Sequence, residues 1–239
     1  MTIAELIRDF KVLVDKEDRE SFPDLQPEHI KLFLDLSATR KQKQIYGRTN
    51  PKREGFEESR KRKDDLRLLV KTGTSAAVQN PSASISSGEG LEFTVWEATF
   101  PSDYRFLLKT LAKVVYADCA DEETYVEVSP KEVQQDDVYA AIIDPFNRPT
   151  VLRPLAVTEG NLTQIYVPAG TSVPQIRLTY LRNPRSILTD PFYANENTEY
   201  QEFPSHVHDE IVREAVTLAL EDLEAPRYQT SLNEEMRQE

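Results

Sequence analysis

Few side chains in this sequence are spaced to carry out chemistry together, and the closest grouping is a pair of histidines. His206 and His208 stand two positions apart in a stretch with helical spacing. Two histidines that bind one metal ion from a helix stand three or four positions apart, on the same face. With Asp209 beside them, these histidines suit the capped, solvated start of a helix better. The pair therefore predicts no metal site.

The single cysteine and two pairs of adjacent acids are the remaining candidates for reactive groups. Cys119 lies next to Asp118 and near Asp121, whose negative charge disfavours the thiolate that a nucleophile needs. The pairs at 64–65 and 136–137 are carboxylates that could hold a metal ion, but adjacent acids on a solvated surface are more common. The seven glycines form no phosphate-binding loop, and no Gly-x-Ser-x-Gly motif occurs. The sequence thus predicts a protein that is not an enzyme and holds no cofactor and no metal ion.

Composition excludes several classes of protein. One cysteine rules out a disulfide framework, and its scarcity fits a reducing compartment. No run of 18 apolar residues occurs, so no membrane-spanning helix is expected, and the first ten residues lack the apolar core of a signal peptide. An apolar fraction of 39%, with ten Tyr and ten Phe in 239 residues, is too rich for a disordered chain. The length suits one or two folded domains.

Charge is distributed unevenly along the chain. The net charge is −12, but residues 1–73 carry +3 and the remaining residues carry −15. The segment 40–71 holds 12 basic and 5 acidic side chains. An acidic surface repels nucleic acid and releases no counterions from it, so DNA wrapping is not expected. The acidity either serves solubility or lines a space through which DNA passes without binding.

A run of four basic residues, at 60–63, resembles a nucleic-acid contact at first sight. No aromatic residue is interleaved with it, however, and two aspartates follow directly at 64–65. The run is therefore interpreted as a solvated helix face supported by ion pairs, or as a patch that docks on an acidic partner. In a protein that assembles with itself, that partner could be the acidic face of the next copy.

The first third of the chain predicts three helices, which make up a helical section over residues 1–73. Thr2 and Glu5 have the spacing of a capping box, and apolar residues at helical spacing follow to Val14. A second helix is expected from Pro27 to Gly47, with Arg40, Lys41 and Lys43 in exposed turns. A third is expected over 53–71. Residues 74–90, rich in Ser, Thr, Ala and Gly, predict a flexible linker or long loop.

Residues 91–202 predict a β-rich domain, mostly antiparallel and built as a sandwich or a barrel. Alternating β-branched and aromatic residues mark strands near 91–96, 125–128, 150–157, 164–167 and 175–181. The segment 106–116 fits either a helix or a strand, and a strand is favoured because a turn and an alternating return strand follow it. Residues 144–149 contain two prolines and predict a rigid loop.

The last section, residues 203–239, predicts a long amphipathic helix followed by a polar tail. Pro204 and Ser205 suit the helix start, and Pro226 suits its end. A wide apolar stripe includes Val207, Ile211, Val212, Ala215, Val216, Ala219, Leu220 and Leu223, with Glu210 and Glu214 placed on the other side. The tail is expected to order only against a partner. The chain as a whole is thus assigned to the α+β class.

Several of these segments resemble a known family of proteins. They read EHIKLFLD at 28–35, RKDDLRLLV at 62–70, FPSDY at 100–104, DPFNRP at 144–149, TYLRNP at 179–184, FPSHVHDEIV at 203–212 and LEAPRYQ at 223–229. On these segments, of which 203–212 is the strongest, the chain is similar to virion structural proteins of crAss-like tailed phages. The similarity is to the ring or adaptor proteins of the neck in particular.

This resemblance implies a structural virion protein that forms a head-to-tail connector ring. About twelve copies would form a ring in the neck below the portal, extend the DNA channel without binding DNA specifically, and offer a docking surface to tail proteins. The protein would be part of the virion, would be assembled in the cytoplasm of the bacterial host, and would have no membrane as a partner. Closing a ring requires one face of each copy to fit a different face of the next. Candidate residues for contacts with other subunits or with the portal are Arg60, Lys61, Arg62, Lys63, Arg67, Ile211, Val212, Arg227 and Tyr228.

Three alternatives remain open at this point. The chain could be another virion component, such as a head-surface or tail-hub protein, which its position in the particle would decide. It could be a soluble assembly factor that is absent from finished particles. It could also be a hydrolase, which a deep pocket with converging carboxylates of altered pKa would indicate.

Overall fold

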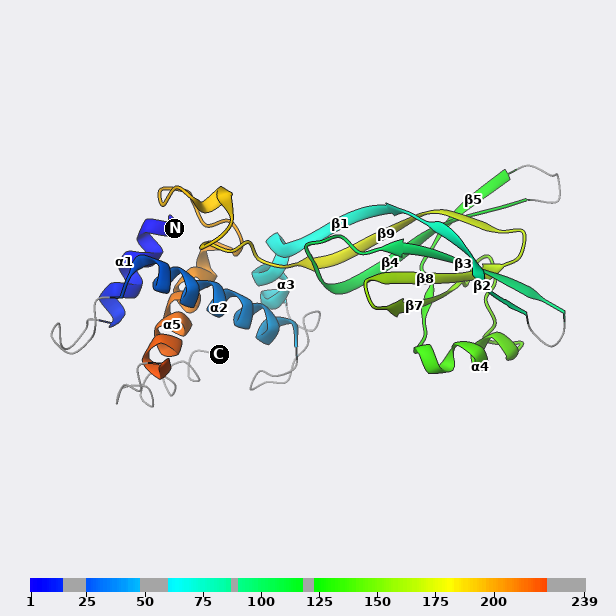
Figure 1. The fold of residues 1–239 in the computed structure, drawn as a ribbon, viewed down its shortest axis with the longest axis horizontal. Helices are drawn as coiled ribbons and strands as arrows, with labels where there is room; N and C mark the ends of the chain where they lie inside the picture. The colour runs from blue at the N-terminus through cyan, green and yellow to red at the C-terminus, as the bar shows by residue number, and fades with distance from the viewer. Residues whose placement is uncertain (15–24, 48–59, 87–89, 118–122, 223–239) are drawn as a thin grey trace. The chain divides into compact units, whose positions relative to one another are not determined.

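The computed structural model describes residues 1–14, 25–47, 60–86, 90–117 and 123–222 (Figure 1). The chain divides into two compact units, each described here by itself. The first, called the helical unit, comprises Met1–Leu69 and Asn183–Glu239, and the second, called the β unit, comprises Val70–Arg182. The predicted α+β class is confirmed, with an N-terminal helical section, a central antiparallel β domain and a C-terminal helix.

The helical unit begins with the predicted capping box. The Thr2 backbone N–H donates to Glu5 Oε2 at 2.9 Å, and the Glu5 N–H donates to Thr2 Oγ1 at 3.2 Å. The second helix begins at Pro27 and ends before Gly47, whose N–H donates to the Lys43 carbonyl at 2.8 Å. The elements of this unit are α1 (Ile3–Val14), α2 (Pro27–Tyr46), α3 (Arg60–Leu66), η1 (Arg67–Leu69), η3 (Pro191–Tyr193) and α5 (Ser205–Asp222).

The core of the helical unit lies where α1 and α2 pack on α5. The apolar faces predicted for α1 and α5 are the ones that are buried. Phe10 stacks on Phe33 with ring centroids 6.5 Å apart, and full burial of a side chain of this size contributes about 1.5–3 kcal/mol. Buried residues of the three helices include Ile3, Leu6, Ile7, Phe10, Ile30, Leu34, Val207, Ile211, Val212, Ala215 and Ala219.

The chain returns to the helical unit at Asn183, twenty residues before the predicted end of the β-rich domain. The return segment, residues 183–204, has little regular structure but buries Ile187, Tyr193, Tyr200 and Phe203. Tyr193 Oη donates to Glu202 Oε1 at 3.1 Å inside this segment. Four apolar anchors spread over 17 residues follow neither helical nor strand spacing, so the sequence pattern did not assign the segment to the helices.

The β unit contains two sheets whose neighbouring strands are antiparallel, apart from the parallel pair β6 and β7. The four-stranded sheet has the order β1-β9-β4-β5 and the five-stranded sheet the order β2-β3-β8-β7-β6. The strands are β1 (Val70–Ala76), β2 (Val78–Ser86), β3 (Glu92–Thr99), β4 (Tyr104–Ala117), β5 (Glu123–Val128), β6 (Lys131–Glu132), β7 (Leu155–Glu159), β8 (Leu162–Pro168) and β9 (Ser172–Arg182). A 3-10 turn, η2 (Gln135–Asp137), leads into α4 (Val138–Ile143).

The two sheets form a sandwich because they share one core. That core contains Ala112 and Val114 of β4 together with Ile165 and Val167 of β8. Strand alternation then directs the intervening residues of the five-stranded sheet to its outer face. There α4 covers them, in a second cluster formed by Phe93, Val95, Leu155, Val157 and Tyr166 with Val138 and Ile142.

Residues 70–86 form strands β1 and β2 where the sequence predicts the end of a helix and a flexible linker. Strand β1 pairs along its whole length with β9. Most of its side chains are exposed, and the sequence there lacks the apolar alternation by which a strand is predicted. Pro81 lies where the register between β2 and β3 shifts, a position at which a strand tolerates proline. Of the predicted helix over 53–71, the described part is α-helical from Arg60 to Leu66 and continues as the 3-10 turn η1, and residues 53–59 lie outside the described ranges.

The ambiguous segment 106–116 is a strand, as favoured. It belongs to β4, which pairs with β5 on one side and β9 on the other. Three register irregularities occur between β4 and β9. Each irregularity interrupts the two-residue alternation of side chains, which explains why the sequence pattern also fitted a helix.

Candidate functional site

The basic run predicted as a contact surface lies on α3 and η1. Arg60, Lys61, Lys63 and Arg67 are exposed, and Arg62 is half-buried. The other side of this short helix is anchored by Leu66, which is fully buried, and by the neighbouring Asp65. The basic side chains therefore point outward, while Leu66 and Asp65 on the other side of the segment attach it to the rest of the helical unit.

Asp65 and His206 form the polar part of that anchor. His206 Nε2 and Asp65 Oδ1 lie 2.7 Å apart, and the carboxylate is almost completely buried. The sequence placed 64–65 among surface acid pairs and His206 in solvent contact. His206 and Asp64 are exposed as expected, but Asp65 is buried and bonded to His206 at the start of α5. No one-dimensional pattern connects two residues 141 positions apart.

The second histidine is buried under the start of α5. His208 Nε2 lies 2.8 Å from the carbonyl oxygen of Phe203. Burial lowers the pKa of His208, although the Phe203 carbonyl opposes that shift. Its hydrogen bond to a carbonyl requires a proton on Nε2, so the neutral ring donates there. In the described parts of the chain, no three His, Cys, Asp or Glu side chains gather as a metal site would require.

Charged contacts join α2 and α3 to α5, and sequence reasoning missed them. Lys41 Nζ lies 3.0 Å from Glu210 Oε2, and Lys61 Nζ lies 3.8 Å from the other oxygen of the same carboxylate. Arg40 Nε lies 3.4 Å from Glu214 Oε1, and Glu214 is buried. Lys41 and Glu214 were expected on exposed faces.

Lys41 and Glu214 are buried because α5 is covered on more than one side, by α1 and by α2. An amphipathic pattern predicts only the face that is most apolar. The sequence did contain one usable signal: Glu210 and Glu214 are spaced i, i+4 and so share a face that can meet basic residues of another helix.

The remaining predicted interface residues do not lie on the basic surface. Ile211 and Val212 are buried in the core of the helical unit, where they cannot touch another subunit while the unit is folded. Both belong to the apolar stripe of α5, so the same apolar character that suggested an interface made them core residues. Arg227 and Tyr228 lie outside the described residues.

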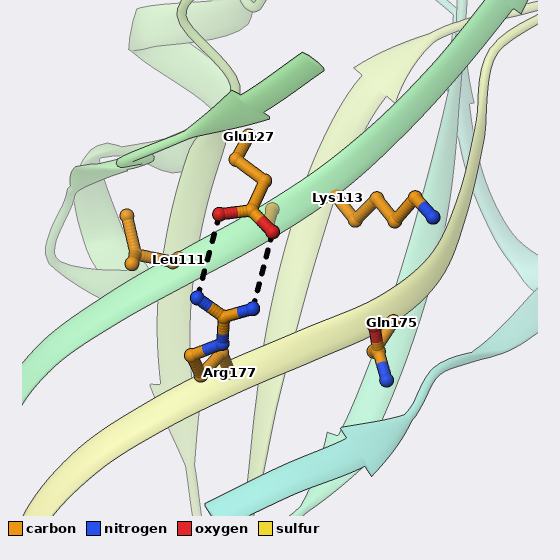
Figure 2. Close-up of a pocket in the computed structure, with 6 residues that line it drawn as sticks. Leu111, Lys113, Glu127, Gln175 and Arg177 are labelled. Carbon is orange, nitrogen blue, oxygen red and sulfur yellow. Dashed lines mark hydrogen bonds and ion pairs between the residues drawn. The ribbon is translucent and has the colours of Figure 1, made fainter. Parts of the chain in front are cut away.

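In the β unit, a shallow hollow lies on the outer side of the four-stranded sheet (Figure 2). Arg177 spans it and donates to Glu127 through Nη2 at 3.1 Å and Nη1 at 3.4 Å. Leu111, Lys113 and Gln175 complete its wall. It has room for about one water molecule, far less than the several hundred Å³ of a typical ligand site.

Asp103 is a carboxylate of the β unit that two side chains hold by hydrogen bonds. It accepts from Lys71 Nζ at 2.7 Å and from Tyr180 Oη at 2.8 Å. Burial alone would raise the pKa of Asp103, but the hydrogen bonds from Lys71 and Tyr180 outweigh it and lower the pKa. Burial, together with the bond to Asp103, raises the pKa of Tyr180 to about 12. The three side chains join β1 and β9 to the turn before β4, so we interpret the cluster as stabilising the fold.

A family model described as phage tail ring protein 3/4, from the crAss ring group, matches residues 1–229. The match covers both units and all seven segments on which the resemblance rests. A search of curated proteins finds no match to the chain. None of the described helices is long and apolar enough to cross a membrane. The chain therefore belongs to the family of crAss-like phage tail ring proteins 3/4, a family of structural phage proteins.

Proposed function

We propose that this protein forms a closed ring of about twelve copies in the neck of the phage particle, below the portal. There it connects head to tail and continues the channel through which DNA passes. Membership of a ring-protein family supports assembly with copies of itself and with other tail proteins. The neck position, the portal partner and the copy number follow from the resemblance and form part of the proposal.

One structural observation carries the proposal most directly: the outward basic surface of α3 and η1. Residues 60–67 hold five basic and two acidic side chains, and one of the two acids, Asp65, is buried. The chain after residue 73 carries −15. A ring closes through contacts between two different faces, and oppositely charged faces on one chain meet that requirement.

The same charge distribution supports a channel that DNA crosses without binding. Phosphates are repelled by an acidic wall, and no counterions are released in favour of binding. We also propose that the protein has no enzymatic activity. The described residues contain no group of three metal-ligating side chains, which supports this part of the proposal.

The test is cryo-electron microscopy of intact particles. A ring of this chain directly below the portal, with about twelve copies around the axis, is expected. Density on the head surface or at the tail hub would replace the proposed neck position. Absence from purified particles would instead favour an assembly factor.

Charge reversal tests the basic surface. Arg60→Glu, Lys61→Glu and Arg62→Glu together replace attraction by repulsion at three positions. An exposed ion pair contributes about 0.2–1 kcal/mol, so the interface should lose roughly 1–3 kcal/mol, or about 5–150-fold in association constant. Native mass spectrometry of portal-bound assemblies measures this loss.

The matched control makes the same change in net charge at three exposed basic residues away from α3. These are Lys11, Lys109 and Arg153, each changed to Glu. The control should assemble as the unsubstituted protein does. Unchanged ring formation by the α3 variant, or equal loss in both variants, would refute a specific role of the basic surface.

A further inference from the structure

A stripe of large apolar side chains lies uncovered on α4 and the turn that follows it. The exposed fractions are 62% for Tyr139, 50% for Ile143 and 89% for Phe146. On the opposite side of α4, Val138 and Ile142 are buried against the five-stranded sheet. From the sequence, only residues 144–149, which include Phe146, were singled out, as a rigid loop.

Tyr139 and Ile143 are spaced i, i+4, which places them on one face of α4. The helix ends at Asp144, whose backbone is extended (φ −70°, ψ 117°) and whose N–H donates to the Ala140 carbonyl at 3.1 Å. A separate turn follows, in which the Arg148 N–H donates to the Asp144 carbonyl at 2.9 Å. The stripe thus comprises one face of α4 and the exposed Phe146 of the turn after it.

A local hydrogen-bond network holds the backbone of the turn that carries Phe146. Asp144 Oδ1 accepts from the Phe146 N–H at 3.0 Å, and Asp144 Oδ2 accepts from Asn147 Nδ2 at 2.6 Å. Lys131 Nζ donates to Asn147 Oδ1 at 2.9 Å, which ties the turn to β6. The Phe146 N–H and the Asn147 side chain lower the pKa of Asp144, so its carboxylate remains ionised. A partner that covers Phe146 therefore does not have to order the backbone of this turn.

The stripe is large enough to matter for association. A large apolar side chain buries about 150–250 Å² when fully covered, so the three exposed fractions amount to roughly 400 Å². That is near the largest apolar patch of a typical monomer and about half of what one partner contributes to a standard interface. A single partner surface of ordinary size could therefore cover the stripe.

Acidic residues outnumber basic ones along the segment that carries the stripe, and the basic surface of α3 and η1 complements it. Residues 131–148 contain four acids and two bases, and Glu132, Asp136 and Asp137 are exposed. Residues 60–68 contain five bases and two acids, and they add one exposed apolar side chain, Leu68, at 43%. The two surfaces thus have net charges of opposite sign, and both include exposed apolar side chains.

We propose that the stripe on α4 of one copy docks on α3 and η1 of the next copy, an inference that rests on the proposed ring. The contact joins two different surfaces of the same chain, so each copy uses both and the chain of contacts can close. Phe146 is the central apolar anchor, and the acidic and basic residues around it set the orientation.

The experiment measures copies of the full-length protein per particle, in phages that carry substituted genes, by quantitative mass spectrometry. Ile143→Ser with Phe146→Ser removes the apolar anchor and should lower incorporation at least tenfold. Tyr125→Ser is the matched control, because Tyr125 is an aromatic residue on β5 with an exposed fraction of 65%. It should be incorporated normally, and circular dichroism of each purified variant checks that it is folded.

Charge exchange identifies the partner. Glu132→Lys with Asp136→Lys, and separately Arg60→Glu with Lys63→Glu, should each lower incorporation roughly tenfold. All four substitutions in one chain should restore incorporation to within about threefold of the original. Restoration supports contact between two copies.

The outcomes separate this inference from the proposed function. If the unsubstituted protein is absent from particles, the proposed ring is refuted and the inference with it. If it is present but the serine variant is incorporated normally, only the docking inference is overturned. If both charge variants fail and their combination fails too, the stripe faces a different protein, which also overturns contact with a second copy.

Discussion

Asp35 of α2 determines where the return segment lies in the helical unit. Its Oδ1 accepts from the Ile187 N–H at 2.7 Å, and its Oδ2 accepts from Ser186 Oγ at 2.6 Å and from the Leu188 N–H at 3.3 Å. We predict that Asp35→Ala releases this segment from α2 and lowers the free energy of unfolding of the helical unit.

The size of the effect follows from which donors lose their partner. The bond from the Ile187 N–H is partly buried, and the loss of a bond to a charged acceptor costs about 1.5–3 kcal/mol. Ser186 Oγ is partly buried and adds about 0.5–1 kcal/mol, while the exposed and longer bond from Leu188 adds little. The expected loss is therefore about 2–4 kcal/mol.

Urea unfolding followed by circular dichroism at the helical band measures this loss. Asp9→Ala is the matched control, because Asp9 lies on α1 and, among the described residues, accepts from the adjacent Arg8, at 2.8 Å and 3.0 Å. The control should change the free energy of unfolding by less than about 0.5 kcal/mol. Equal, small effects of both substitutions would refute the assignment of Asp35 as the anchor of the return segment.

Two further predictions concern the capping box and the buried tyrosine of β9. Thr2→Ala should destabilise the helical unit by about 1 kcal/mol in the same unfolding assay, because the Glu5 N–H loses its acceptor; no change would contradict the cap. Tyr180 has its pKa raised to about 12 by burial and by Asp103, so the folded state retains a proton that the unfolded state loses near pH 10. The β unit should therefore lose stability, by up to about 2–3 kcal/mol, as the pH rises from 10 to 12. Tyr180→Phe should flatten this pH dependence, and an unchanged slope would show that another group causes it.

Local features of the fold were predictable from the sequence because neighbouring residues produce them. The capping box of Thr2 and Glu5, the start of α2 at Pro27 and the start of α5 at Ser205 all depend on residues within one helical turn. The apolar faces of α1 and α5 follow from spacing alone. The basic run at 60–63 was also visible, since its exposure on a short helix follows from its composition.

Strands without an apolar pattern were not predictable. β1 and β2 were read as a linker because their side chains are largely polar, and only pairing with β9 and β3 makes them strands. The backbone hydrogen bonds of β1 join residues about 100 positions apart and leave no trace in local composition. β2 pairs with the neighbouring strand β3, but its polar side chains give it no apolar alternation. The return segment was missed for the same reason, because its anchor on Asp35 lies about 150 positions away.

The sequence alone determined that this chain is acidic after residue 73, basic around 60–67, and similar to crAss-like ring proteins along most of its length. The tertiary structure decided which of those residues are available to a partner. It buried Ile211, Val212, Lys41 and Glu214 and left the stripe ending at Phe146 uncovered. The physical reason is that burial depends on how many elements pack around a side chain, whereas an amphipathic pattern reports only the most apolar direction of one element.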